Sequence, residues 1–148
     1  MIVPPDPKAD PEKIAPKYIL LAEDDVDDVE FLTGSLQNLD QGIIVKVINS
    51  GDKALAFFER LDDQQLPGLI IMDYNLPALN GYQILAMLAV NKRYKSIPKI
   101  IWSTSNSGFF EKECLANGAM AYFVKPADLT GYDLLAKKLI GLLNGQTR

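Results

Sequence analysis

The stretch Leu69-Ile70-Ile71-Met72-Asp73-Tyr74-Asn75-Leu76-Pro77 decides how this chain folds. Apolar residues lead into a single acid, Pro77 disfavours continuation, and Asn80-Gly81 follows as a turn. A short, bounded apolar run of this kind is typical of a fully buried strand. An unpaired carboxylate inside such a strand would be costly, so Asp73 is expected at the strand end, on the edge of a sheet. That position is suited to chemistry.

Composition and charge limit the class of protein. The 148 residues are 48% hydrophobic and 23% charged, which is typical of one globular domain with a sizeable core. No apolar run approaches the roughly 20 residues that cross a bilayer, and no secretory signal is recognisable. We therefore expect a cytoplasmic protein without a membrane partner. The lone Cys114 cannot form an internal disulfide, which agrees with a reducing compartment. A net charge of −4 without a long basic run gives no support for nucleic-acid binding.

The chain contains no histidine. This excludes a Ser-His-Asp triad, a histidine general base and histidine metal ligands within it. Any bound metal would need oxygen ligands, which favours a hard cation such as Mg²⁺.

Proline distribution suggests the domain limits. Residues 1–16 contain five prolines and scattered charges, which predicts a flexible tail. We expect one domain over 17–144 and a short C-terminal tail over 145–148, with no second domain and no internal repeat.

Apolar patterns predict five strands that alternate with five helices. The expected strands are Tyr18–Ala22, Ile43–Ile48, Leu69–Asp73, Ile100–Trp102 and Tyr122–Val124. The expected helices are Val26–Leu39, a second helix after the second strand, about Tyr82–Tyr94, Phe110–Ala116 and Leu129–Leu143. The second helix has Ala54, Leu55, Phe57, Phe58 and Leu61 on its apolar face. Asn80 is the expected N-cap of the third helix, and Asn117-Gly118 ends the fourth. This alternation predicts an α/β fold with a doubly wound parallel sheet, covered by helices on both faces.

Reactive side chains follow four of the strands. Glu23-Asp24 follows the first, Asp73 ends the third, Ser103 follows the fourth and Lys125 the fifth. In the strand order 2-1-3-4-5 the first and third strands are neighbours, so Asp24 and Asp73 should lie close together.

Clustered carboxylates repel one another unless a proton or a cation intervenes, and oxygen-ligated Mg²⁺ fits this need. Asp73 would then be a nucleophile that accepts a phosphoryl group, with Lys125 and Ser103 bonding to the phosphoryl oxygens. Asp27, Asp28 and Glu30 are interpreted only as stabilising the N-terminus of the first helix.

Five sequence segments resemble a known family. Together they closely resemble the receiver domain of bacterial two-component response regulators, the CheY-like family, over about residues 17–143. The segments are Ile19-Leu-Leu-Ala-Glu-Asp24, Ile71-Met-Asp-Tyr-Asn-Leu-Pro77 with Asn80-Gly81, Pro98-Lys-Ile-Ile-Trp-Ser103, Gly118-Ala119 and Tyr122-Phe-Val-Lys-Pro126.

The resemblance implies a phosphoacceptor and a metal site. Asp73 matches the phosphoacceptor, and Glu23 and Asp24 match the acidic pair. Asp24 and Asp73 would touch the metal directly, Glu23 would touch it through water, and the backbone carbonyl of Asn75 would be a further ligand. The pair Asp24-Asp25 is an alternative reading of the acidic pair.

The resemblance also implies switch residues. Ser103 matches the switch hydroxyl, with Thr104 as the alternative, and Lys125 matches the family lysine. Tyr122 matches the aromatic residue that turns inward on activation. The Lys125-Pro126 bond resembles one that is cis in the family. Ser105 lies where receivers tune acyl-phosphate lifetime, which the sequence does not predict.

The expected function is that of a stand-alone receiver. A histidine kinase or histidine phosphotransfer protein would donate the phosphoryl group, and slow autodephosphorylation would follow. A downstream protein target would bind the surface made by the fourth helix, fifth strand and fifth helix, which could also form a homodimer. The rival is a phosphate-independent interaction module. Asn75 stands where a haloacid dehalogenase-type phosphatase needs a second acid, and acids after the first strand disfavour an FMN phosphate.

Aromatic residues near the strand ends have two readings. Trp102 is expected to pack in the core beside the site. Phe109-Phe110 is expected in a loop. A contact of this pair with a partner protein is an alternative that we favour less.

Overall fold

Five parallel strands form the centre of the computed structural model, which describes residues 17–145. Residues 1–16 and 146–148, where the sequence predicts tails, lie outside the described residues. The strand order β2-β1-β3-β4-β5 confirms the predicted doubly wound topology. The strands are Tyr18–Ala22 (β1), Ile44–Ile48 (β2), Leu69–Asp73 (β3), Lys99–Ser103 (β4) and Ala121–Val124 (β5).

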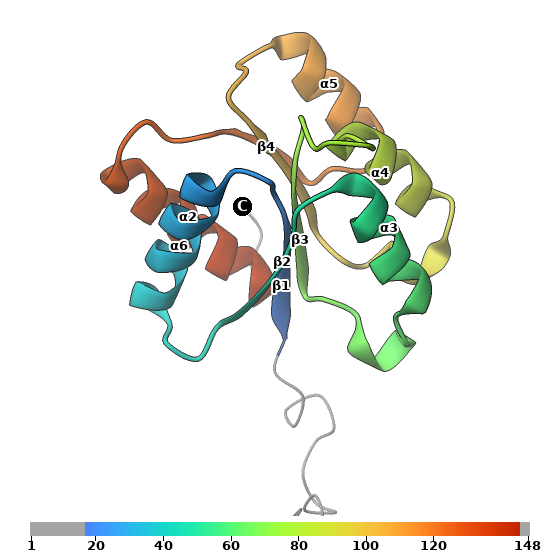
Figure 1. The fold of residues 1–148 in the computed structure, drawn as a ribbon, viewed down its shortest axis with the longest axis horizontal. Coiled ribbons are helices and arrows are strands. Elements are labelled where there is room, and N and C mark those ends of the chain that lie inside the picture. The colour runs from blue at the N-terminus through green and yellow to red at the C-terminus, as the bar shows by residue number, and fades with distance from the viewer. Residues whose placement is uncertain (1–16, 146–148) are drawn as a thin grey trace, which may run out of the picture.

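Helices cover both faces of this sheet, with α2 and α6 on one side and α3, α4 and α5 on the other (Figure 1). Single-turn 3₁₀ helices (η1 and η2) follow α3 and α4. The bounds are Val26–Leu39 (α2), Gly51–Arg60 (α3), Asp63–Gln65 (η1), Gly81–Ala89 (α4), Lys92–Tyr94 (η2), Gly108–Ala116 (α5) and Leu129–Leu143 (α6).

The two core layers follow from the alternation of side chains along each strand. In β3, Leu69 and Ile71 pack towards α2 and α6, whereas Ile70 and Met72 pack towards the other three helices. Every residue of β3 is buried, as expected for a central parallel strand. The layers therefore hold the Asp73 end of β3 in a fixed position.

Local capping signals predict most helix ends correctly. Asn80 and Gln83 form a capping box at the start of α4, with reciprocal bonds of 2.8 and 2.9 Å. Asn117 caps α5, and Gly118 follows in the left-handed region at φ +100°.

The predicted end of the helix near Tyr94 is wrong. The α-helix ends at Ala89 and a separate 3₁₀ turn covers Lys92–Tyr94. Asn91 causes the break, because its side chain accepts from the Arg93 N–H in competition with the helical backbone.

Gly81 and Gly108 begin α4 and α5 and provide a matched pair of alanine substitutions. A Cβ on Gly81 would lie 2.7 Å from the Asp73 carbonyl oxygen, whereas one on Gly108 would meet nothing within 4 Å. We expect Gly81→Ala to lower the free energy of unfolding by about 1–3 kcal/mol through overpacking. Gly108→Ala should be neutral or stabilising by up to about 1 kcal/mol. Equal effects in urea unfolding would contradict this difference.

The only cysteine should be unreactive in the folded protein. Cys114 is fully buried, and burial raises the pKa of its thiol to about 11. Because the thiolate is the nucleophile, alkylation at pH 8 should be at least about 100-fold slower in the folded than in the unfolded protein. Mass spectrometry after iodoacetamide treatment, with and without denaturant, measures both rates. Rapid labelling of the native protein would show that α5 opens.

Candidate functional site

Three carboxylates meet at the carboxyl ends of β1 and β3. Glu23 and Asp24 follow β1, and Asp73 is the last residue of β3. The two strands pair with Ala22 opposite Met72, so the acids come next to one another. One carboxylate oxygen from each acid lies within 4.8 Å of the others. The structure thus brings together the acids that the sequence placed on neighbouring strand ends.

Glu23 is the most deeply buried member of this cluster, with 1% of its surface exposed against 5% for Asp73. Its Oε2 accepts from the N–H groups of Asp24 and Asp25 at 3.0 and 3.1 Å. Its Oε1 lies 2.6 Å from Lys125 Nζ. Burial and the nearby Asp73 raise the pKa of this carboxyl to about 8, although Lys125 acts in the opposite direction. A cation in the cluster would oppose this effect by favouring the ionised form of the carboxyl.

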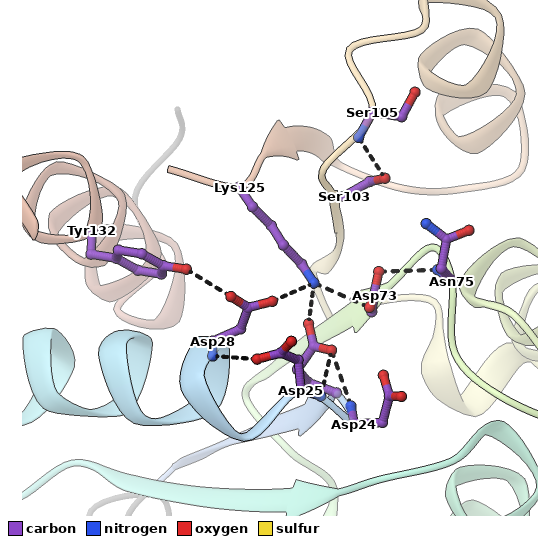
Figure 2. Close-up of polar contacts among 10 residues, drawn as sticks. Asp24, Asp25, Asp28, Asp73, Asn75, Ser103, Ser105, Lys125 and Tyr132 are labelled. Carbon is purple, nitrogen blue, oxygen red and sulfur yellow. Dashed lines mark hydrogen bonds and ion pairs between the residues drawn. The ribbon is translucent and has the colours of Figure 1, made fainter. Parts of the chain in front are cut away.

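Lys125 lies at the centre of the site, directly after β5 (Figure 2). Its Nζ contacts Glu23 at 2.6 Å, Asp28 at 2.8 Å and Asp73 at 3.1 Å, and its side chain is 7% exposed. It also lies 4.9 Å from the centre of the Trp102 ring. Burial alone would lower the pKa of the ammonium, but the bonds to Asp28 and Glu23 outweigh this and raise it. The lysine is therefore a permanent cation.

Asp28 belongs to the site, so its interpretation as a helix-end charge alone is wrong. It lies in the first turn of α2, where its carboxylate accepts from Lys125 Nζ at 2.8 Å and from Tyr132 Oη at 3.2 Å. A sequence signal existed, because Asp28 precedes the buried residues Leu32 and Leu36 at intervals of four on one helix face. Tyr132 was not singled out from the sequence at all.

Asp73 offers one oxygen to each side of the site. Oδ1 accepts from the backbone N–H of Asn75 at 3.0 Å, and Oδ2 faces Lys125 at 3.1 Å. Asn75 is exposed and lies in the loop between β3 and α4. The carboxylate is thus oriented by its own loop and by the lysine.

The hydroxyl candidates after β4 differ in burial. Ser103 is fully buried and its Oγ accepts from the Ser105 N–H at 3.1 Å, whereas Thr104 is exposed. Ser105 Oγ in turn accepts from the Ser107 N–H at 3.2 Å. Ser103 keeps its own O–H free to donate to another group, which agrees with the choice of Ser103 over Thr104.

Tyr122 connects β5 to the loop that follows β4. Its ring packs against the core layer of α3, α4 and α5, and its Oη donates to the Ser105 carbonyl oxygen at 2.7 Å. The Ser103 and Tyr122 positions are therefore joined through Ser105.

Two alternatives from the sequence can be compared with the structure. Asp25 is the N-cap of α2, with Oδ1 accepting from the Asp28 N–H at 3.0 Å, and it lies outside the three-carboxylate cluster. This arrangement favours Glu23 and Asp24 as the acidic pair. The expected cis Lys125-Pro126 bond is wrong, because every peptide bond within residues 17–145 is trans. The trans isomer is the intrinsically favoured one.

The aromatic side chains beside the site lie in the core or in helix α5. Trp102 is fully buried, as predicted, and is paired with Asp73 across β4 and β3. Phe109 and Phe110 lie in the first turn of α5, so their prediction as loop residues is wrong. The helix predicted from Phe110 begins two residues earlier, at Gly108, where its N-cap Ser107 accepts from the Phe110 N–H. Phe110 stacks on Tyr74 with ring centres 4.5 Å apart.

The site suits a divalent metal ion. Glu23, Asp24 and Asp73 provide only oxygen ligands, and their mutual repulsion calls for a positive charge beyond that of Lys125. Such ligands match hard cations.

No helix within residues 17–145 is long and apolar enough to cross a bilayer.

Comparisons with known proteins agree with this geometry. Residues 19–136 match the family described as response regulator receiver domain. The chain is 31% identical over 112 residues to two-component response regulator ORR11 of Oryza sativa subsp. indica, covering 76% of this chain and 73% of that protein. It is 32% identical over 131 residues to two-component response regulator ARR8 of Arabidopsis thaliana, covering 76% and 57%.

Solved structures show the same fold. The phosphorylated cyanobacterial phytochrome response regulator RcpA aligns with a TM-score of 0.79 at 25% identity, over 88% of this chain and 96% of that one. The Mn²⁺-bound form of response regulator Rcp1 aligns with a TM-score of 0.75 at 25% identity, over 85% and 93%. Receiver domains are signalling modules rather than classical enzymes, and they take phosphoryl groups from histidine kinases or phosphotransfer proteins. This chain belongs to the receiver domain family of two-component response regulators.

Proposed function

We propose that the protein accepts a phosphoryl group on Asp73 from a histidine kinase or a histidine phosphotransfer protein. The observation that carries the proposal is the placing of the Asp73 carboxylate between the Lys125 ammonium, 3.1 Å away, and two further acids. The 148 residues contain no histidine, so none of them can present the phosphohistidine. The donor must therefore be a separate protein or a histidine outside these residues.

In the transfer, an Asp73 carboxylate oxygen forms a bond to phosphorus while the phosphorus–nitrogen bond of the phosphohistidine breaks and its electron pair stays on the imidazole. Lys125 donates to a phosphoryl oxygen, and Ser103 donates its free O–H to another. Asn75 N–H keeps the carboxylate oriented through its 3.0 Å bond. These groups stabilise charge that develops as the phosphoryl group moves.

We infer that Mg²⁺ is the metal, held directly by Asp24 and Asp73, by the Asn75 carbonyl oxygen, and by Glu23 through water. When bound, Mg²⁺ would supply positive charge beside the phosphoryl oxygens. The Mn²⁺-bound form of Rcp1 supports a divalent cation of this kind.

The proposed output is a change at the face made by α5, β5 and α6. Ser103 would move towards the phosphoryl group, and the Tyr122–Ser105 bond would break and let the Tyr122 ring turn. Exposed apolar side chains on these elements, Val124 of β5 and Leu134 of α6, support a role for them in binding a downstream protein target or a second copy of the chain. The cytoplasmic location and the domain limits at 17–144 remain predictions.

Intact-mass spectrometry with acetyl phosphate tests the proposed function. With Mg²⁺ the protein should gain the mass of one phosphoryl group, and hydroxylamine should remove it because an acyl phosphate is labile. Excess EDTA should prevent the addition. No addition from acetyl phosphate or from a phosphorylated phosphotransfer protein would contradict the proposal and favour a phosphate-independent interaction module.

A further inference from the structure

We propose that Asp28 and Tyr132 are positioning residues, which hold the Lys125 ammonium beside Asp73 (Figure 2). The inference rests on the proposed function and adds two residues that touch neither the phosphoryl group nor the metal. It concerns the chain of contacts from Tyr132 through Asp28 to Lys125.

Lys125 has three ammonium protons and three carboxylate partners. Two of these partners, Glu23 and Asp73, are proposed metal ligands, and Asp73 is also the proposed phosphoacceptor. Their charge and bonding would change during the reaction. Asp28 is the one partner outside the metal cluster, so it can bind the ammonium in every state.

Asp28 is itself held in place from two sides. The Asp25 side chain accepts from the Asp28 backbone N–H at 3.0 Å, which fixes the first turn of α2. Each carboxylate oxygen of Asp28 then has one partner, Tyr132 on Oδ1 and Lys125 on Oδ2. Its side chain is only 22% exposed, so little water competes for these bonds.

Tyr132 has little freedom to move. It is buried in α6 and packs against two aromatic rings, with ring-centre distances of 5.5 Å to Phe31 and 6.3 Å to Trp102. Burial and the adjacent Asp28 raise the pKa of its hydroxyl to about 12, so it remains a proton donor at neutral pH. Tyr132 thus anchors Asp28 from a helix that lies beside α2.

Positioning and simple electrostatics predict opposite results. Asp28→Asn removes a negative charge near the incoming phosphoryl group, so a purely electrostatic role would raise the rate. Loss of positioning should instead lower the maximal rate of phosphorylation by about 10-fold, because the lysine is no longer held for the transition state. Tyr132→Phe changes no charge and should lower the rate by about 3-fold.

The experiment measures phosphorylation rates against acetyl phosphate concentration at saturating Mg²⁺, for wild type, Asp28→Asn, Tyr132→Phe and the double variant. Asp27→Asn is the matched control, since Asp27 is an exposed acid in the same turn. The emission of Trp102, the only tryptophan, reports whether Lys125 has left its ring. Calorimetric titration gives the Mg²⁺ affinity of each variant.

Support requires slower maximal rates in both single variants, with half-saturating donor concentration and Mg²⁺ affinity in Tyr132→Phe within about twofold of wild type. The double variant should match Asp28→Asn, because Tyr132 acts through Asp28. Trp102 emission should change in Asp28→Asn but not in Asp27→Asn.

Wild-type rates in Tyr132→Phe, or a faster Asp28→Asn, would overturn the inference while leaving the proposed function intact. Failure of the wild type itself to take a phosphoryl group would overturn both. If Asp28→Asn does not fold, the phosphorylation rate of Tyr132→Phe still tests the inference, because this variant keeps the buried aromatic ring and loses only the hydroxyl.

Discussion

Asp73→Asn should abolish phosphoryl acceptance and leave the fold intact. The amide is a far weaker nucleophile than the carboxylate, and no other acid in the three-carboxylate cluster has the same contacts. The Asn side-chain oxygen can still accept from the Asn75 N–H, a bond that is 3.0 Å long in the wild type. The loop after β3 should therefore keep its conformation.

The stability of this variant tests the charge cluster. Without metal, removing one of three clustered acids relieves repulsion, so the free energy of unfolding should be unchanged or higher by up to about 1 kcal/mol. Intact mass after acetyl phosphate treatment and urea unfolding in EDTA measure the two effects.

Asp25→Asn is the control, because it also neutralises one acid near the site. Asparagine caps helices about as well as aspartate, so α2 should keep its N-terminus. This variant should be phosphorylated at close to the wild-type rate. Loss of phosphorylation in Asp25→Asn, or its retention in Asp73→Asn, would contradict the assignment of Asp73.

Lys125→Met should change phosphorylation and metal binding in opposite directions. Methionine keeps much of the chain length but lacks the ammonium that lies 3.1 Å from Asp73. Loss of this donor to the phosphoryl group should lower the maximal rate by at least about 100-fold. The same change removes a positive charge in contact with two proposed metal ligands, so Mg²⁺ should bind at least about tenfold more tightly.

Metal-free stability gives a third readout for Lys125→Met. Without the lysine, Glu23 and Asp28 lose a buried ion-pair partner, and the free energy of unfolding in EDTA should fall by about 3–5 kcal/mol. Saturating Mg²⁺ should restore part of the lost free energy of unfolding, because it binds to the folded state. Weaker Mg²⁺ binding in this variant would contradict the proposed metal site.

Patterns within single segments determine most of the fold. The buried run Leu69–Asp73, the alternation of strands and helices, and caps such as Asn80 are properties of neighbouring residues. The helix end at Ala89 was missed because Asn91 competes for the backbone within an otherwise apolar pattern. Sequence periodicity alone does not weigh that competition.

The candidate site follows from the sequence only where its residues end strands. Topology brings Glu23, Asp24 and Asp73 to one edge, which the strand order already predicts. Ser103 and Thr104 are adjacent in sequence, and both carry a hydroxyl. Only the structure distinguishes the two candidates, because Ser103 is buried and Thr104 is exposed.

The sequence by itself determined the parallel sheet and the acids and lysine at its carboxyl edge, because these depend on local patterns. The handedness of the crossovers left few strand orders, and the order 2-1-3-4-5 followed from the family that the sequence resembles. Only the tertiary structure decided that Asp28 and Tyr132 join them. Asp28 bonds to Lys125 and Tyr132, which are 97 and 104 residues away, and such pairs form only after α2 and α6 pack on the same face. The spacing of Asp28 from Leu32 and Leu36 indicates the face of α2 on which it lies, but it does not identify a partner, and the packing of two distant helices supplies Lys125 and Tyr132.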